Sequence, residues 1–191
     1  SPHTAHLTQQ VLYMTRATLL LAALMMLTAP VAKADSVTDR LLPIQKEWAI
    51  IKYETPDKDK QITAIRGLQA KAAALEAAAP ARAEPKIWHA ITLATEASFE
   101  RGLSSLPLVK KSKNLLEEAI KIDGTALNGL GYTYLGSLYD QVPGWPISFG
   151  DWEDASAMFK KALEISPDDI DANYFYGQHL ASRKNYDGAV L

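Results

Sequence analysis

The sequence contains no cysteine among its 191 residues. This absence excludes disulfides, cysteine-based zinc sites, iron–sulfur clusters, thiol catalysis and anchoring through a lipidated cysteine. The sequence also has no excess of charge of either sign, since 20 Lys and Arg stand against 22 Asp and Glu, and this balance argues against nucleic-acid binding. No stretch shows the sustained period-two alternation of a β-strand. We therefore predict an all-α protein of one domain, or at most two small ones.

Acidic residues are absent from the first 34 positions. There the apolar run 17–29 follows Arg16 and is closed by a proline and by the motif Ala-Lys-Ala at 32–34. A basic start, a short apolar core and an A-x-A end predict a secretory signal peptide over residues 1–34, and hence export, most simply to the periplasm. The run is shorter than a membrane span, so we expect no stable span after cleavage. An uncleaved anchor and a buried core helix are the alternatives.

The two ends of the sequence carry further expectations. Met14 is a natural start for a signal peptide, so we interpret residues 1–13 as upstream read-through. At the other end, the last helix stops at Leu191, before a complete repeat of the kind described below. Either the sequence is a C-terminally truncated fragment, which we favour, or its end pairs with another molecule in self-association.

Helical patterns dominate the remainder, residues 35–191. Apolar residues recur at steps of three and four over 62–75, as they do on one face of a helix. Two later segments, 113–123 and 156–166, align without a gap at an offset of 43 residues. Internal similarity at such a period is typical of a repeat protein.

One repeat shows a full pattern of small and aromatic residues over two helical segments, followed by a proline. The residues of this pattern are Tyr132, Leu135, Gly136, Tyr139, Gly150, Trp152, Ala155, Phe159, Ala162 and Pro167. They resemble the tetratricopeptide repeat family. The resemblance is strong over 126–191 and weaker over 86–125, where Gly124 stands in place of the proline.

The resemblance implies an all-α fold of three to four stacked antiparallel helical hairpins, a tetratricopeptide-like α-solenoid, preceded by the signal peptide. We expect a degenerate hairpin over 35–85 and repeats over 86–191, the last of them incomplete. The resemblance also implies a non-catalytic protein–protein interaction or scaffold module of the periplasm, with a protein or peptide partner. The alternative is a small-ligand-binding accessory protein of a transport system, similar to the T-components of substrate-binding transporters.

One segment departs from the family pattern, which this chain exceeds by seven residues within 140–151. The segment holds two prolines, two glycines, Trp145 and Phe149, a composition typical of a stiff, shaped loop. In one interpretation these aromatic side chains pack onto the adjoining hairpin. In another the loop forms one wall of a binding pocket, and in a third it has no role.

The concave surface of such an array is lined by the first helix of each repeat. The resemblance places Thr133, Ser137 and Asp140 there in one repeat, and Asp171, Tyr174 and Gln178 in the next. These positions lack the Lys, Arg and Asn with which chaperone-binding members hold a peptide carboxylate, so we expect a preference for neutral or basic peptides, or for a small ligand. The candidate binding surface, loop included, is Thr133, Tyr134, Ser137, Asp140, Trp145, Phe149, Asp171, Tyr174 and Gln178.

Catalytic motifs are missing from residues 35–191. The two histidines of this part, His89 and His179, have no metal-binding spacing, and no P-loop or G-x-S-x-G motif is present. We expect His89, which follows Trp88, on a helix surface. The sequence therefore predicts no enzyme activity, no bound metal and no cofactor.

Overall fold

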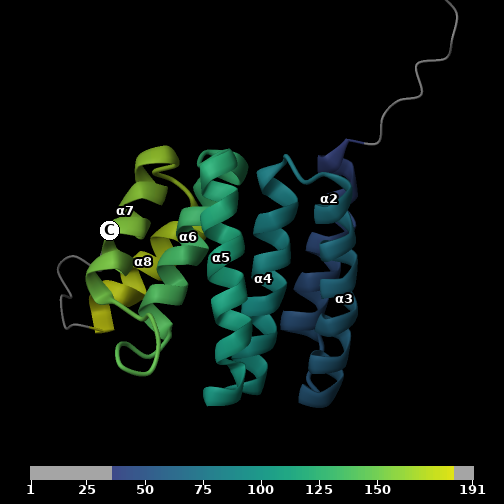
Figure 1. Cartoon of the computed structure of the whole chain (residues 1–191), viewed down its shortest axis with the longest axis horizontal. Coiled ribbons are helices and arrows are strands. Elements are labelled where there is room, and N and C mark those ends of the chain that lie inside the picture. The colour runs from purple at the N-terminus through teal and green to yellow at the C-terminus, as the bar shows by residue number, and fades with distance from the viewer. Residues whose placement is uncertain (1–35, 183–191) are drawn as a thin grey trace, which may run out of the picture. The chain divides into compact units, whose positions relative to one another are not determined.

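The computed structural model describes residues 36–182. Within this range every regular secondary-structure element is a helix (Figure 1). The predicted signal peptide and the last residues of the final repeat lie outside this range. No helix within 36–182 is both long and apolar enough to cross a membrane. The all-α prediction is confirmed. In chain order the elements are α2 (Val37–Ala49), the π-helical turn η2 (Ile50–Glu54), α3 (Lys58–Ala78), α4 (Ala83–Glu100), the 3₁₀ turn η3 (Leu103–Ser105), α5 (Leu106–Ile122), α6 (Ala126–Gln141), α7 (Trp152–Ile165) and α8 (Ile170–Ser182).

Short side chains with an oxygen begin several of these helices. Ser36 accepts a hydrogen bond from the Asp39 N–H at the start of α2, at 3.1 Å, and Asp57 accepts one from the Lys60 N–H at the start of α3, at 2.8 Å. Asp151 does the same at the start of α7. Each cap satisfies N–H groups that have no partner within the helix, and a capping residue of this kind is typically worth about 1 kcal/mol.

Consecutive helices pack in pairs, α2 with α3, α4 with α5 and α6 with α7, while α8 packs against α7. Contacts between the pairs join α3 to α4 and α5 to α6, and they also join α2 to α4, α4 to α6 and α6 to α8. The helices α2, α4, α6 and α8 form one row, with α3, α5 and α7 in the other (Figure 1). This arrangement confirms the predicted stack of helical hairpins. Its concave candidate surface is the row of α2, α4, α6 and α8.

The core between the last helices follows the small-and-aromatic pattern of the sequence. Phe159 is fully buried, and Ala155 and Ala162 beside it on α7 are fully buried too. A Cβ atom added to Gly136 of α6 would lie 2.9 Å from the Phe159 ring, closer than Cβ atoms come to other atoms in proteins. Gly136 therefore allows α6 and α7 to approach, as the repeat pattern predicts.

Candidate functional site

A cavity of about 460 Å³ opens on the row of α4, α6 and α8. Its walls come from one residue of η2, the C-terminal half of α4, the turn that follows it, the start of α5, the C-terminal half of α6, the first residues of the loop after α6 and one residue of α8. Volumes of roughly 300–1,000 Å³ are typical of small-molecule sites. Most of the wall is apolar, formed by Ala94, Ala97, Leu106, Val109, Leu138 and Phe175 among others.

The charged residues at this cavity are cations. Lys52 and Arg101 line it, and no Asp or Glu does. The Lys52 ammonium lies 4.7 Å from the centre of the Trp48 ring and 5.3 Å from that of Tyr53. Within residues 36–182 neither Lys52 nor Arg101 forms an ion pair. The cavity therefore combines an apolar wall with two positive charges that no carboxylate neutralises at contact distance.

Arg101 reaches the cavity through an unusual backbone turn. It ends α4 with φ 56° and ψ 160°, and Gly102 follows with φ 84°. Side chains other than glycine rarely adopt a positive φ of this kind, and the conformation costs of the order of 1–3 kcal/mol. The turn redirects the chain at the mouth of the cavity, where η3 then forms.

Tyr134 and Ser137 of α6 supply polar groups to the wall. Burial raises the pKa of Tyr134 above its usual value, so this side chain stays a neutral phenol. Within the described residues its hydroxyl has no hydrogen-bond partner, whereas the Ser137 hydroxyl accepts a hydrogen bond from Gln141 at 2.8 Å. The Tyr134 ring packs edge-on against Phe175, with ring centres 6.0 Å apart. Tyr134 can therefore offer a hydrogen bond from a ring that is held in place.

The inserted loop joins α6 to α7 and is tied at its base. The Gly150 N–H donates to the Pro143 carbonyl at 3.0 Å, and the Asp151 N–H donates to the Tyr139 carbonyl at 2.9 Å. A Cβ on Gly150 would fall 1.7 Å from the Val142 carbonyl oxygen, so only glycine fits at this position. These backbone contacts hold the loop in a defined shape, as the composition predicts.

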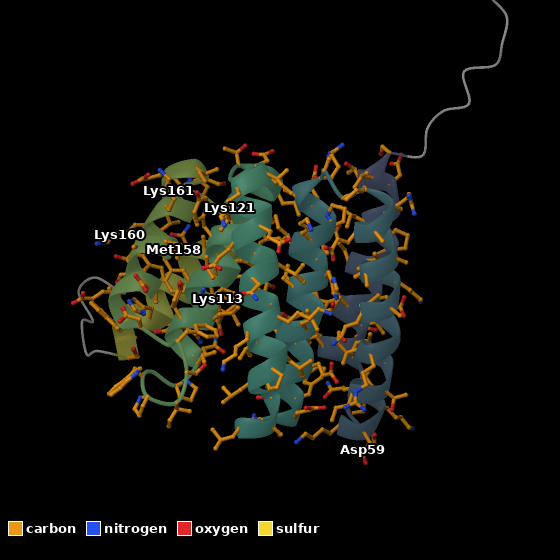
Figure 2. All side chains as sticks on the ribbon, viewed as in Figure 1. Asp59, Lys113, Lys121, Met158, Lys160 and Lys161 are labelled. Carbon is orange, nitrogen blue, oxygen red and sulfur yellow. The ribbon has the colours of Figure 1, made fainter. Side chains whose placement is uncertain are left out.

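The two aromatic side chains of the loop take different positions. Phe149 is half-buried and packs edge-on against Tyr139, with ring centres 5.8 Å apart. The Lys113 ammonium lies 5.7 Å from the centre of each of these rings, and Figure 2 labels it on α5. Trp145, in contrast, is 91% exposed. The expectation of packing is therefore right for Phe149 and wrong for Trp145, because the closed base of the loop projects its tip away from the hairpin.

The structure separates the remaining predicted site residues. Tyr134 and Ser137 line the cavity, together with Val142 and Pro143 from the first residues of the loop. Thr133 is only 1% exposed and lies in the core instead of the groove. Asp171, Tyr174 and Gln178 are exposed on α8, where the Gln178 amide donates to the Tyr174 hydroxyl at 2.8 Å. The last of the nine, Asp140, belongs to a buried network.

That network joins three helices through His179 of α8. The His179 ring is fully buried, with Nε2 2.7 Å from the Ser156 hydroxyl of α7 and Nδ1 2.6 Å from the Asp140 carboxylate of α6. The ring stacks on Trp152 and lies near-parallel to Tyr176, with centres 4.6 Å and 6.1 Å away. Asp140 is therefore a partner of His179 rather than a residue of the open groove.

Ser156, His179 and Asp140 are connected in the same order as the catalytic triad of a hydrolase. The position of Ser156 differs from that of a triad serine. Ser156 lies within α7, where backbone N–H groups bond to carbonyls of the preceding turn. The backbone N–H groups of this turn are therefore engaged within α7. The network connects α6, α7 and α8.

The expectation that His89 lies on a helix surface is wrong. This residue is 6% exposed, not on a helix surface, and its Nδ1 lies 2.5 Å from the Glu76 carboxylate of α3. The pairing has no signature in the sequence, because the stacking of α3 on α4 creates it. Within the described residues, no group of three or more His, Asp or Glu side chains is placed to hold a metal ion.

The stacked hairpins and the row of first helices define a helical-repeat protein, an α-solenoid. A family model of the tetratricopeptide repeat matches residues 147–190. This segment contains α7 and α8, and over it the chain is similar to the tetratricopeptide repeat family. No curated protein matches the chain. Repeats of this family are typically protein-interaction modules, and the match supports a helical-repeat module of this kind in the matched part of the chain.

Proposed function

We propose that this chain is an exported, non-catalytic interaction module that binds a protein or peptide partner through the loop at 142–151. The observation that carries the proposal is the exposure of the loop tip. Trp145 is 91% exposed and Ile147 is 54% exposed, and no charged residue lies between Gln141 and Asp151. A large apolar side chain held in water by a tied loop gains free energy when a partner covers it.

The exported location rests on the sequence pattern of residues 1–34. Expression with the leader intact, followed by cell fractionation and N-terminal sequencing, tests it. We expect a periplasmic product that begins at Asp35, and a cytoplasmic, uncleaved product when Leu21→Arg interrupts the apolar run. Equal distribution of the two chains would contradict export.

The partner hypothesis is tested by capture from a periplasmic extract. Trp145→Ala removes the exposed ring, and Leu42→Ala, on α2 with 49% exposure, is the matched control. We expect the control to retain the partner of the wild type and Trp145→Ala to lose most of it. Indistinguishable partner sets for all three chains would remove the loop from the binding surface.

A second candidate function, binding of a small ligand as an accessory to transport, is favoured by one observation. The cavity of about 460 Å³ is large enough for a small molecule and has a mostly apolar wall with polar groups at a few points. Only the base of the loop reaches this cavity, through Val142 and Pro143. Ligand binding and partner binding therefore use neighbouring but different surfaces.

A further inference from the structure

The charges of the cavity define a ligand class. We propose that the cavity on α4, α6 and α8 binds a small amphiphilic anion, with its apolar body against Leu106, Leu138 and Phe175 and its carboxylate toward Lys52 and Arg101. This inference rests on the second candidate function, that the cavity is a ligand site, and adds the chemistry of the ligand.

The two cations of the cavity have no carboxylate partner among the described residues. Elsewhere in the described array basic side chains at helix contacts are paired, as Lys86 is with Glu76 at 2.9 Å and Arg66 with Glu96 at 2.5 Å. Lys52 and Arg101 differ, because both line the cavity and neither has a carboxylate within ion-pair distance in residues 36–182. An anion in the cavity would supply a carboxylate partner for Lys52, whose ammonium lies over the Trp48 and Tyr53 rings, and for the exposed Arg101.

Nearby acids do not fill that role. Asp171 of α8 is close enough to Lys52 for their charges to interact, yet it forms no ion pair with Lys52 and does not line the cavity. Desolvation, followed by the neighbouring charge of Asp169, raises the pKa of Asp171 above its usual value, while the charge of Lys52 acts to lower it. A cationic ligand would find no carboxylate in the cavity wall.

The backbone at Arg101 has an unusual conformation, with a positive φ. The helix α4 ends at Glu100, and both Arg101 and Gly102 after it have a positive φ. Strained backbone of this kind persists where the surrounding structure holds it, frequently at ligand sites. Here the strained turn places Arg101, an exposed residue whose guanidinium is suited to a planar carboxylate, among the residues that line the cavity.

The wall of the cavity is mostly apolar and includes one tyrosine, Tyr134. The wall offers no charge to the body of a ligand beyond the two cations, and an aliphatic or aromatic body would bury its surface there. Tyr134 lines the same cavity, and its hydroxyl, which has no hydrogen-bond partner among the described residues, is a potential donor to an anionic oxygen. The carboxylate of an amphiphilic anion would thus face the two cations, and its apolar body would face the apolar wall.

Isothermal titration calorimetry with three probes of equal chain length tests the headgroup. We expect octanoate to bind the purified chain at least fivefold more tightly than octanol, and octylammonium to bind most weakly. Equal or tighter binding of octanol or octylammonium would overturn the anionic class while leaving a ligand site in place. Failure of all three probes to bind would overturn this inference, and the small-ligand function of the cavity with it.

Three variants test the position of the anion. We expect Lys52→Met and Arg101→Gln each to weaken octanoate binding about tenfold, equivalent to about 1.4 kcal/mol, with octanol unaffected. Lys46→Met is the matched control, because Lys46 is exposed on α2, does not line the cavity and has no ion pair in the described residues. Circular dichroism verifies the helical content of each variant. Unchanged octanoate affinity in both cavity variants would overturn the assignment.

Discussion

The contact of α3 with α4 and the contacts among α6, α7 and α8 are built from different chemistry. Between α3 and α4, Glu96 is 4% exposed and accepts hydrogen bonds of 2.5 Å from both Arg66 and Gln69. Among α6, α7 and α8, the aromatic ring of Phe159 fills the space above Gly136. The contact of α3 with α4, the charged end, thus includes an ion pair between the buried Glu96 and an Arg66 side chain that is 58% exposed, while the contacts among α6, α7 and α8, the ring-packed end, include a buried aromatic ring. The comparison indicates that neighbouring helices of the array can be held in close contact either by ion pairs and hydrogen bonds or by aromatic rings.

The largest expected effect concerns the ring packing. Phe159→Ala removes a fully buried ring from the contact of α6, α7 and α8. We expect a loss of about 3–5 kcal/mol in the free energy of unfolding, measured by urea denaturation. Ile170→Ala, at a side chain that is 83% exposed on α8, should change it by less than about 0.5 kcal/mol. A loss below about 1 kcal/mol for Phe159→Ala would show that ring packing does not hold this end.

A smaller effect is expected from the partner of that ring. Gly136→Ala places a Cβ 2.9 Å from the Phe159 ring, and we expect it to cost about 1–3 kcal/mol by overpacking. In the Phe159→Ala background the ring is gone, so the cost should fall to a few tenths of a kcal/mol. Urea denaturation of both single variants and the double variant measures the coupling. Additive effects would show that Gly136 is needed for another reason.

The charged end responds to pH. Glu76 of α3 contacts Lys86 and His89 of α4. Desolvation acts to raise the pKa of Glu76, but the hydrogen bonds from His89 and Lys86 outweigh it and hold this pKa below its usual value. A lowered carboxyl pKa stabilises the fold above about pH 4.5, and this contribution disappears as the pH falls through the folded-state value.

We therefore expect Glu76→Gln to cost about 1–2 kcal/mol at pH 7 and much less at pH 3, measured by urea denaturation at both values. Glu54→Gln, at an exposed carboxylate on η2 without an ion pair in the described residues, is the control and should show no such pH dependence. An equal cost of Glu76→Gln at both values would contradict a role for its charge.

The smallest effect on stability is expected in the loop. Trp145→Ala changes a side chain that is 91% exposed, so the free energy of unfolding should move by no more than about 0.5 kcal/mol. Thermal denaturation followed by circular dichroism measures it. A larger loss would mean that Trp145 holds the loop, and the loss of partner binding in this variant would then reflect folding.

The sequence predicted the ring-packed end in detail, because a period and a pattern of small and aromatic residues carry it. Gly136, Ala155, Phe159 and Ala162 lie where the repeat pattern puts them. The charged end escaped prediction because its pairs join residues far apart in the chain. Glu96 and Arg66, for example, are brought together only when α3 packs on α4.

The candidate site was predictable in part for a similar reason. Ser137, which the repeat resemblance places on the groove, lines the cavity together with Tyr134, whereas Thr133, which the same resemblance places there, lies in the core. Lys52 comes from η2, and Arg101 from a strained turn, so no repeat position points to either of them. The sequence therefore suggested a mildly acidic groove, whereas the cavity in the structure carries two cations.

Trp145 is also a fluorophore that the solvent can reach. The chain has four tryptophans, of which Trp88 is 7% exposed and Trp48 and Trp152 are half-buried, whereas Trp145 is 91% exposed. A collisional quencher dissolved in water reaches the exposed indole first. The loop thus contains its own optical reporter, and a partner that covers it would protect part of the emission from the quencher without any added label.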